Sequence, residues 1–285
     1  MSVGTVARQR FPATMRALGT ARSGWARLGE QARFFGKTLA AIVDVVVYYR
    51  AELLRQIAAM SLGTGSLAVV GGSVAVVAFL TMSTGGTIAS EGFNQFSNIG
   101  VEAMTGFGTA FANTRLVTPF TACIAFAATI GAGATAQLGA MRINEEIDAL
   151  EVMGIRPIAY LAATRVAAGV IVAVPLYCVA LILGYSAGEL ITTTYYGQSS
   201  GVFVHYFHTF FIPADVLRSF VVTVAEVTTI MLVHTYYGFT ARGGPAGVGE
   251  AVGRATRASL TIAGLVIMFV TLALYGQTGH FNLAG

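Results

Sequence analysis

The residues best suited to chemistry in this chain form one short acidic segment, Asn144 to Gly154. Four of the chain's 13 acidic residues lie within seven positions there, namely Glu145, Glu146, Asp148 and Glu151. Carboxylates form charge-assisted hydrogen bonds with Arg and Lys side chains, so an acidic helix of this kind suits contact with a basic soluble partner. A solvated loop helix with no partner is the alternative interpretation.

The apolar residues of the same segment predict how it is held. Ile143, Ile147 and Leu150 share one face of a helix, whereas Glu145 and Asp148 lie nearly opposite. Gly154 is placed to end the helix, and Pro157 follows early in the next one. We predict that the contact residues are Glu145, Glu146, Asp148, Glu151, Met153 and Gly154.

Other residues that resemble reactive sites do not fit one. Gly36-Lys37-Thr38 resembles the end of a phosphate-binding loop, but that loop needs a Gly where the chain has Gln31. His205 and His208 could reach one metal ion, yet two imidazoles in an aromatic segment more often lie at an interface. We therefore predict no catalytic residue, no metal site and no cofactor bound by this chain.

Two ionisable residues, Glu226 and His234, lie within or near a very hydrophobic stretch. Ionisable groups inside a membrane are costly and are functional by default. Glu226 could relay protons, or it could form a hydrogen bond across a dimer interface. The sequence leaves both interpretations open.

Composition places the chain in a membrane. Of its 285 residues, 55% are hydrophobic and 11% are charged, against about 25% charged in soluble domains. The mean hydropathy is +0.71. The net charge of +4 is explained by where the basic residues lie, so no nucleic acid is expected. Cys123 and Cys178 lie in apolar stretches and show no disulfide or zinc pattern.

Five stretches are long and apolar enough to cross a membrane, since a crossing helix needs about 20 apolar residues. The second stretch is interrupted by Arg115 and Pro119, which predicts a short re-entrant or broken helix before its span. Residues 192–213 are polar and aromatic and are interpreted as an outer loop with an interfacial aromatic belt. We predict an all-α integral membrane protein with spans at about 61–89, 100–139, 157–191, 215–239 and 255–277.

The chain divides into three regions. Residues 1–28 are basic and are expected to form a loosely ordered arm. Residues 29–57 carry apolar residues at helical spacing among charged ones, which favours an amphipathic helix lying in the membrane interface. A cytoplasmic core helix is the alternative. Residues 58–285 form the membrane domain, with the acidic helix between the second and third spans.

The basic residues predict an orientation. Fifteen of the 17 Lys and Arg residues lie before the first span, at 140–165 or at 240–257. Only Arg115 and Arg218 remain. Because Lys and Arg are enriched in cytoplasmic segments, the N-terminus is expected in the cytoplasm and the C-terminus outside.

Three segments resemble one known family. Glu145 to Ile158 is similar to the signature of the MlaE/YrbE family of ABC-transporter permeases. Gly131 to Arg142 resembles the small-residue stretch before it, and Gly243 to Gly249 with Ala255-Thr256-Arg257 resembles the family's cytoplasmic Gly-rich loop and last helix. The resemblance covers about residues 30–280. Within the family, the Arg-rich, Lys-poor composition and the extended N-terminal arm are most similar to actinobacterial YrbE proteins encoded with Mce proteins. Among these, the chain looks most like a mycobacterial B-type subunit.

The resemblance implies a permease dimer in the cell membrane, an interfacial helix and five spans. It implies a cytoplasmic ATPase pair that binds the acidic helix and holds ATP and Mg²⁺, so that this chain is a non-catalytic subunit. In Mce complexes of the fatty-acid or mycolic-acid class, the permease would pair with an A-type YrbE protein. Mce proteins would form a tunnel outside, and lipid would be imported.

The sequence also departs from the family. Many members have Arg-Glu-Leu-Gly-Pro before the small-residue stretch, where this chain has Thr114 to Pro119. A family Glu is replaced by Gln137, and a family Arg is replaced by Ala128. Roles that the family gives to those polar groups therefore do not transfer to this chain.

A transporter of this class needs an apolar cavity, because exposing acyl chains to water costs about 0.8 kcal/mol per CH₂. The candidate lining residues are Val69, Val76, Val77, Leu80, Leu265, Met268 and Phe269. Two alternatives use the same chain differently: a proton-driven secondary transporter with Glu226 as carrier, and a passive anchor for an envelope complex. Sterol and phospholipid are alternative cargoes.

Overall fold

The computed structural model describes residues 12–62 and 72–276, and these residues form helices and turns with no strand among them. Val69 and residues 1–11 and 277–285 lie outside the described residues. The prediction of an all-α protein is confirmed. Five helical segments are long and apolar enough to cross a membrane, at Gly72–Ser97, Glu102–Ile143, Ile158–Tyr195, Pro213–Phe239 and Gly244–Tyr275.

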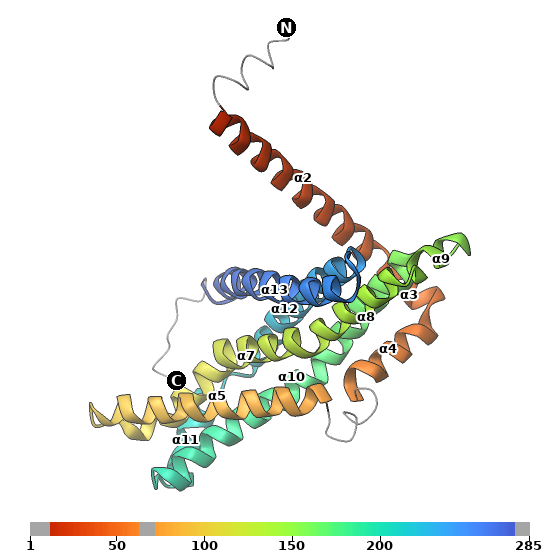
Figure 1. Cartoon of the computed structure of the whole chain (residues 1–285). Helices are drawn as coiled ribbons and strands as arrows, with labels where there is room; N and C mark the ends of the chain where they lie inside the picture. Colours follow the sequence, from red (N-terminus) through yellow and green to blue (C-terminus); the bar gives the residue numbers. More distant parts are fainter. Residues whose placement is uncertain (1–11, 63–71, 277–285) are drawn as a thin grey trace.

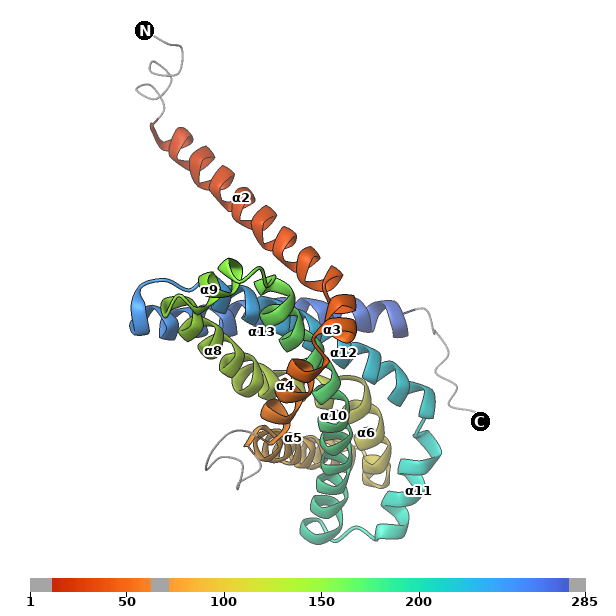
Figure 2. The same cartoon turned by 90° about the vertical axis from the view of Figure 1, so that its right-hand side faces the viewer.

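The N-terminal region is a chain of three helices. α2 (Pro12–Ala40) is long, and α3 (Ile42–Tyr48) and α4 (Arg50–Leu62) follow it. Figures 1 and 2 show α2 running away from the bundle, so the helix begins within the segment expected to be a loose arm. Its last turns are anchored, because Phe34 is buried against Tyr236.

The first membrane segment and the last two are each one continuous helix. They are α5 (Gly72–Ser97), α12 (Pro213–Phe239) and α13 (Gly244–Tyr275). The third segment joins the π-helical turn η5 (Ile158–Ala163) to α10 (Thr164–Leu190) and ends in a second π-helical turn, η6 (Ile191–Tyr195). π-helical turns widen a helix locally and occur frequently at functional sites.

The second membrane segment is built from six short pieces, and its 42 residues would extend about 63 Å as one helix, about twice the hydrocarbon thickness. A 3₁₀ turn, η2 (Glu102–Met104), precedes α6, and two π-helical turns interrupt the rest. Arg115 lies in the first π-helical turn, and Pro119 follows at the start of α7. The pieces after η2 are α6 (Thr105–Ala112), η3 (Asn113–Val117), α7 (Thr118–Phe126), η4 (Ala127–Gly131) and α8 (Ala132–Ile143).

The interpretation of residues 192–213 as a loop is wrong for its central part, which forms α11 (Ser200–Phe210) beside α6. Phe203, Phe207 and Phe211 stack on one another at intervals of four residues, the spacing of one helix face. Phe203 is buried. The Phe203, Phe207 and Phe211 side chains therefore form one packing face.

Small residues bring α5 and α10 together. A Cβ atom on Gly85 would lie 2.5 Å from the carbonyl oxygen of Gly184. On the next turn, a Cβ atom on Gly188 would lie 2.6 Å from the Thr109 side chain of α6. Helices in membranes associate through such small-residue contacts, because lipid gives them no hydrophobic driving force.

Gly85→Ala is expected to destabilise the protein by about 1–3 kcal/mol, because the added methyl group meets backbone, which cannot move aside as a side chain can. Gly36→Ala is the matched control, since a Cβ atom at Gly36 meets no atom within 4 Å. Thermal unfolding in detergent should show a lower midpoint for Gly85→Ala and an unchanged or higher one for Gly36→Ala. Equal midpoints would contradict this account of α5–α10 packing.

Candidate functional site

The acidic segment forms α9 (Glu146–Val152), a short helix between the second and third membrane segments. Two left-handed residues set its ends. Glu145, with φ 62°, precedes the helix, and Gly154, with φ 75°, follows it. The N–H of Gly154 bonds to the Glu151 carbonyl and that of Ile155 to the Leu150 carbonyl, the two bonds of a Schellman C-cap. The predicted role of Gly154 as the helix terminator is therefore confirmed.

The apolar face of α9 is packed on the membrane helices. Ile147 is completely buried in a cluster with Leu138 of α8 and Leu161 of η5. Leu150 packs at the edge of the same cluster. Since this cluster joins the helices on both sides of α9, a displacement of α9 would move the ends of α8 and α10 together.

The outer face of α9 combines charge with exposed apolar side chains. Glu145, Glu146 and Glu151 are exposed. Val152 is 90% exposed and Met153 is 65% exposed, both at the C-terminal end of the helix. Large apolar side chains presented to water beside carboxylates are typical of a protein-binding surface. Sequence reasoning missed Val152, which only the exposure of its side chain distinguishes from the other apolar residues.

Asp148 differs from the other acidic residues of α9. Its carboxylate accepts a hydrogen bond from Arg142 at the end of α8, at 2.6 Å. Both side chains are partly exposed, so the pair adds little stability. It balances the charge of Asp148 with that of Arg142, so the net negative charge of this surface comes from the three glutamates.

The Gly-rich segment forms a second turn against the same part of the bundle. Gly243 (φ 93°) and Gly244 (φ 70°) begin α13. A Cβ atom on Gly247 would lie 1.9 Å from the Arg242 carbonyl oxygen, so the tight turn requires glycine. α13 then packs on α8, where Gly139 meets Val248. The three segments that resemble the family therefore lie together, with α8 in contact with both α9 and α13.

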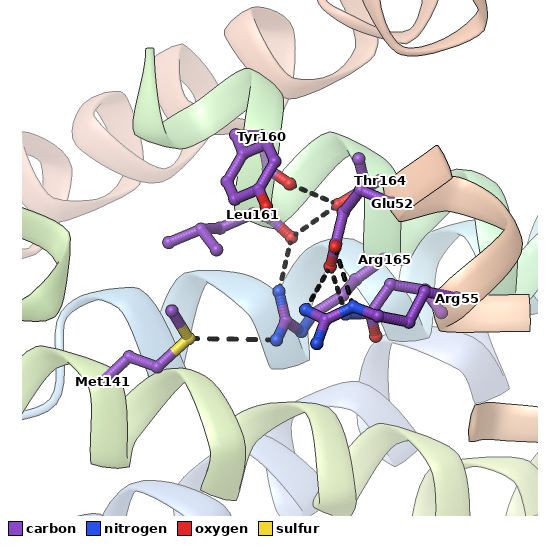
Figure 3. Close-up of polar contacts among 8 residues, drawn as sticks. Glu52, Arg55, Met141, Tyr160, Leu161, Thr164 and Arg165 are labelled. Carbon is purple, nitrogen blue, oxygen red and sulfur yellow. Dashed lines mark hydrogen bonds and ion pairs between the residues drawn. The ribbon is translucent and has the colours of Figure 1, made fainter. Parts of the chain in front are cut away.

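A buried arginine connects α10 to α8 and α4 (Figure 3). Arg165 is 3% exposed, and it donates hydrogen bonds to the Leu161 carbonyl and to the Met141 sulfur. Its Nε has no hydrogen-bond partner in the described part of the chain. Beside it, Glu52 of α4 accepts two hydrogen bonds from Arg55, at 2.8 and 2.9 Å. This polar cluster therefore places α4 beside the ends of α8 and α10.

The stability of the folded state depends on pH through the carboxyl group of Glu52. Burial alone would raise the pKa of its carboxyl group, but hydrogen bonds from Arg55 and Gln56 and the positive charges of Arg55 and Arg165 outweigh burial and lower the pKa below its ordinary value of 4.5. The ionised carboxylate therefore stabilises the folded state above pH 4.5, and this contribution is lost as the pH falls through the lowered pKa.

We expect Glu52→Gln to reduce stability at pH 7 and to have a smaller effect near pH 4, where the carboxyl group of the unfolded chain, with its ordinary pKa of 4.5, binds a proton. Denaturation midpoints of the two proteins at both pH values measure this difference. A deficit of the Glu52→Gln protein that grows toward low pH would contradict the assignment.

The candidate lining residues occupy different surroundings. Val77 is 1% exposed and lies in the core with Leu80 packed beside it. Val76 lines a cavity of about 340 Å³ between α4, α5 and α8, together with Gln56, Ser73 and Gln137. Leu265, Met268 and Phe269 are exposed on α13. Met268 also lines an apolar groove of about 520 Å³.

The two intramembrane ionisable residues are both fully buried in α12. His234 lies between two hydroxyl groups, with Nδ1 2.7 Å from Thr135 of α8 and Nε2 3.0 Å from Ser259 of α13. Glu226 differs, because neither carboxylate oxygen has a hydrogen-bond partner among the described residues. Sequence reasoning missed Thr135 and Ser259, since nothing in a single sequence pairs hydroxyls with a histidine about 100 or 25 positions away.

Comparison with known proteins gives a consistent result. The sequence profile described as Permease MlaE matches residues 63–273. The chain is 28% identical over 166 residues to Protein TRIGALACTOSYLDIACYLGLYCEROL 1, chloroplastic, of Arabidopsis thaliana, covering 58% of this chain and 47% of that protein. It is 27% identical over 179 residues to a probable ABC transporter permease protein of Rickettsia prowazekii, covering 63% and 69% of the two chains.

A probable ABC transporter permease protein of Synechocystis is 26% identical over 189 residues, covering 66% of this chain and 72% of that protein. The matched region thus spans about half of the plant relative and more than two thirds of the bacterial ones.

Proposed function

This chain belongs to the MlaE family of ABC-transporter permeases, and from that premise we propose that it is the membrane subunit of an ATP-driven lipid transporter. Permeases of this family are non-catalytic multi-pass membrane subunits. ATP and Mg²⁺ would be bound by a cytoplasmic ATPase pair. The observation that carries the proposal is α9, which is anchored by buried Ile147 and presents Val152 and Met153 to solvent.

The proposed mechanism runs from α9 into the membrane. ATP binding closes the partner ATPase dimer, which moves α9 through the outer face formed by Glu145, Glu146, Glu151, Val152 and Met153. The buried face of α9 passes this motion to α8 and α10 through Leu138 and Leu161. Two permease subunits then reshape an apolar cavity between them, to which the exposed face of α13 would contribute.

Lipid cargo is supported by the apolar surface of α13 and by the name of the Arabidopsis relative, which contains a glycolipid. We propose the more specific assignment from the sequence resemblance. The chain would be a YrbE B-type subunit of an Mce complex that imports fatty or mycolic acid. It would pair with an A-type YrbE permease beneath a tunnel of Mce proteins.

The proposed orientation follows the basic residues. The N-terminus, α9 and the α12–α13 turn would lie in the cytoplasm, and the end of α13 would lie outside. Helices α2 to α4 would form the interfacial region before the first span. Arg156, after α9, pairs with Asp44 of α3 at 2.9 Å, which would keep the interfacial region and α9 on the same side of the membrane.

Purification of the tagged chain in mild detergent, followed by mass spectrometry of the proteins and lipids that accompany it, tests the proposal. An ATPase, a second permease, Mce proteins and a bound lipid are expected. A chain that arrives alone, under conditions that preserve other membrane complexes, would contradict the heteromeric assignment.

A proton-driven transporter is the second candidate, because the buried carboxylate of Glu226 has no hydrogen-bond partner among the described residues. The two functions differ in their energy source. Transport in reconstituted vesicles that follows a proton gradient, without ATP, and is lost in Glu226→Gln would favour the second candidate. A passive anchor predicts assembly that no ATPase mutation affects.

A further inference from the structure

Three charged residues meet where the last membrane helix ends. Asp215, at the start of α12, is almost completely buried. Arg115 of η3 contacts its Oδ2 through Nε at 2.8 Å and Nη2 at 2.6 Å, and Arg218 contacts its Oδ1 through Nη1 at 2.8 Å. One carboxylate thus faces two guanidinium groups. The three side chains together carry one net positive charge.

The excess positive charge is held close to an aromatic ring. The guanidinium carbon of Arg115 lies 4.9 Å from the centroid of the Tyr275 ring, and that of Arg218 lies 5.7 Å from it. Tyr275 also donates a hydrogen bond to the Asp215 carbonyl oxygen. Cation–π contacts and the fixed backbone bond hold both arginines in position. The contacts with Asp215 use only part of the five N–H donors on each guanidinium.

An apolar groove begins at the same tyrosine. It has a volume of about 520 Å³ and runs along α13, lined by Leu116, Ile267, Met268, Thr271, Leu272 and Tyr275. This volume lies within the roughly 300–1,000 Å³ of pockets that take small ligands. Leu116 directly follows Arg115 in the chain. The arginines and the groove therefore share Tyr275 and adjoin through residues 115 and 116.

Thr271 adds a buried polar group whose hydrogen bonding is unsatisfied. It lies one turn before Tyr275 on α13, and its hydroxyl oxygen is buried without a hydrogen-bond partner among the described residues. A buried polar group without a partner is costly unless a ligand or water satisfies it. The groove thus has a polar, positively charged end and an apolar body.

We propose that this groove binds a long-chain fatty acid, with its carboxylate on Arg115 and Arg218 and its acyl chain along α13 toward Met268. The inference rests on the proposed function, because it places the lipid of that transporter at named residues. A carboxylate carries one negative charge and balances the remaining positive charge. A phosphate monoester carries about −1.5 to −2 and would overcompensate it.

The first test is competition for binding. The full chain, with its co-purifying partners, is placed in phosphatidylcholine nanodiscs and loaded with radiolabelled palmitate. Unlabelled palmitate should compete at least about tenfold more strongly than methyl palmitate, because the ester loses a charge-assisted hydrogen bond. Equal competition by methyl palmitate would overturn the proposal. Equal competition by phosphatidic acid would overturn the assignment of a carboxylate and indicate a general anionic-lipid site.

Substitutions of the two arginines and of Asp215 are expected to change palmitate binding in opposite directions. Arg115→Gln and Arg218→Gln should each weaken palmitate binding about tenfold or more. Asp215→Asn raises the positive charge and should leave binding unchanged or strengthen it, whereas a purely structural role predicts a loss as large as that of Arg115→Gln. Arg254→Gln is the matched control, since Arg254 lies near the other end of α13 and pairs with Glu250. If Arg115→Gln does not fold, Arg218→Gln, whose side chain is 35% exposed, decides alone.

A third variant tests the occupant of the groove. Leu272→Trp should fill the groove and weaken palmitate binding while the complex still assembles. Loss of pairing with a second permease, together with unchanged palmitate binding, would assign the groove to that subunit and overturn the proposal. Failure of the proposed function is a separate result. It would appear as an absent ATPase in the purified complex, whatever the order of the lipid competitors.

Discussion

Replacing Val152 and Met153 together by aspartate is expected to abolish co-purification of the partner ATPase. Both side chains are large, apolar and exposed on α9, and a buried apolar anchor at an interface is worth about 2 kcal/mol or more. Loss of two anchors, with new charges that would be buried against the partner, predicts at least a hundredfold weaker association. Co-purification and a binding titration measure the effect.

The matched control keeps both positions apolar. Val152→Leu with Met153→Leu preserves the surface and should retain ATPase binding. Neither position is buried in the chain, so the aspartate protein should still enter the membrane and keep its thermal midpoint. Wild-type ATPase association by the aspartate protein would show that α9 is not the docking surface.

Ile147→Ala is expected to separate ATP hydrolysis from transport. Ile147 is completely buried between Leu138 and Leu161, and replacing a buried Ile by Ala costs about 2–5 kcal/mol because a cavity remains. The outer face of α9 is unchanged. The ATPase should therefore remain bound and active, whereas ATP-dependent lipid transport in proteoliposomes should fall strongly.

The graded control for this prediction is Ile147→Val, which costs about 0.5–1.5 kcal/mol and should reduce transport only slightly. Both variants alter only the side chain at position 147, so the difference between them reports on the packing of Ile147 against Leu138 and Leu161. Unchanged transport per ATP hydrolysed in the Ile147→Ala protein would contradict the role of this cluster in transmission. Loss of ATPase binding would show that the buried and outer faces of α9 are not separable.

The sequence predicts the elements of this fold better than their contacts. Five apolar stretches and one acidic segment define the five membrane segments and α9, because lipid excludes charge and requires about 20 apolar residues for each crossing. The burial of Ile147 and the C-cap at Gly154 follow from helical periodicity and from the preference of glycine for left-handed conformations.

Periodicity identifies a buried face but does not identify what covers it. Nothing in the spacing of residues pairs Gly85 with Gly184 or brings Thr135 and Ser259 to His234. The sequence identifies Arg115 as an interruption of the second span, and Arg115 and Arg218 as the two basic residues outside the regions predicted to be cytoplasmic. Their shared carboxylate, Asp215, comes from the packing of η3 against α12.

The error at α11 has a related cause. Aromatic residues suit both a membrane interface and a helix–helix contact, and composition does not separate the two. Here Phe203 packs toward α6, where a Cβ atom on Gly106 would lie 2.3 Å from the Phe203 carbonyl oxygen. The glycine that permits this approach lies almost 100 positions away, beyond the reach of local patterns.

The most direct test of the account is a cross-link from α9 to the ATPase. A cysteine is introduced at Val152 in a chain whose exposed Cys178 is replaced by serine and whose remaining cysteine, Cys123, is buried. This protein is treated with a short thiol–amine cross-linker in native membranes. We predict a cross-link to the ATPase whose yield changes when ATP is added, and no ATPase cross-link from a cysteine at Ser200 on α11. Absence of the ATPase from the Val152→Cys product, with the complex otherwise intact, would contradict the central claim that α9 couples this permease to ATP hydrolysis.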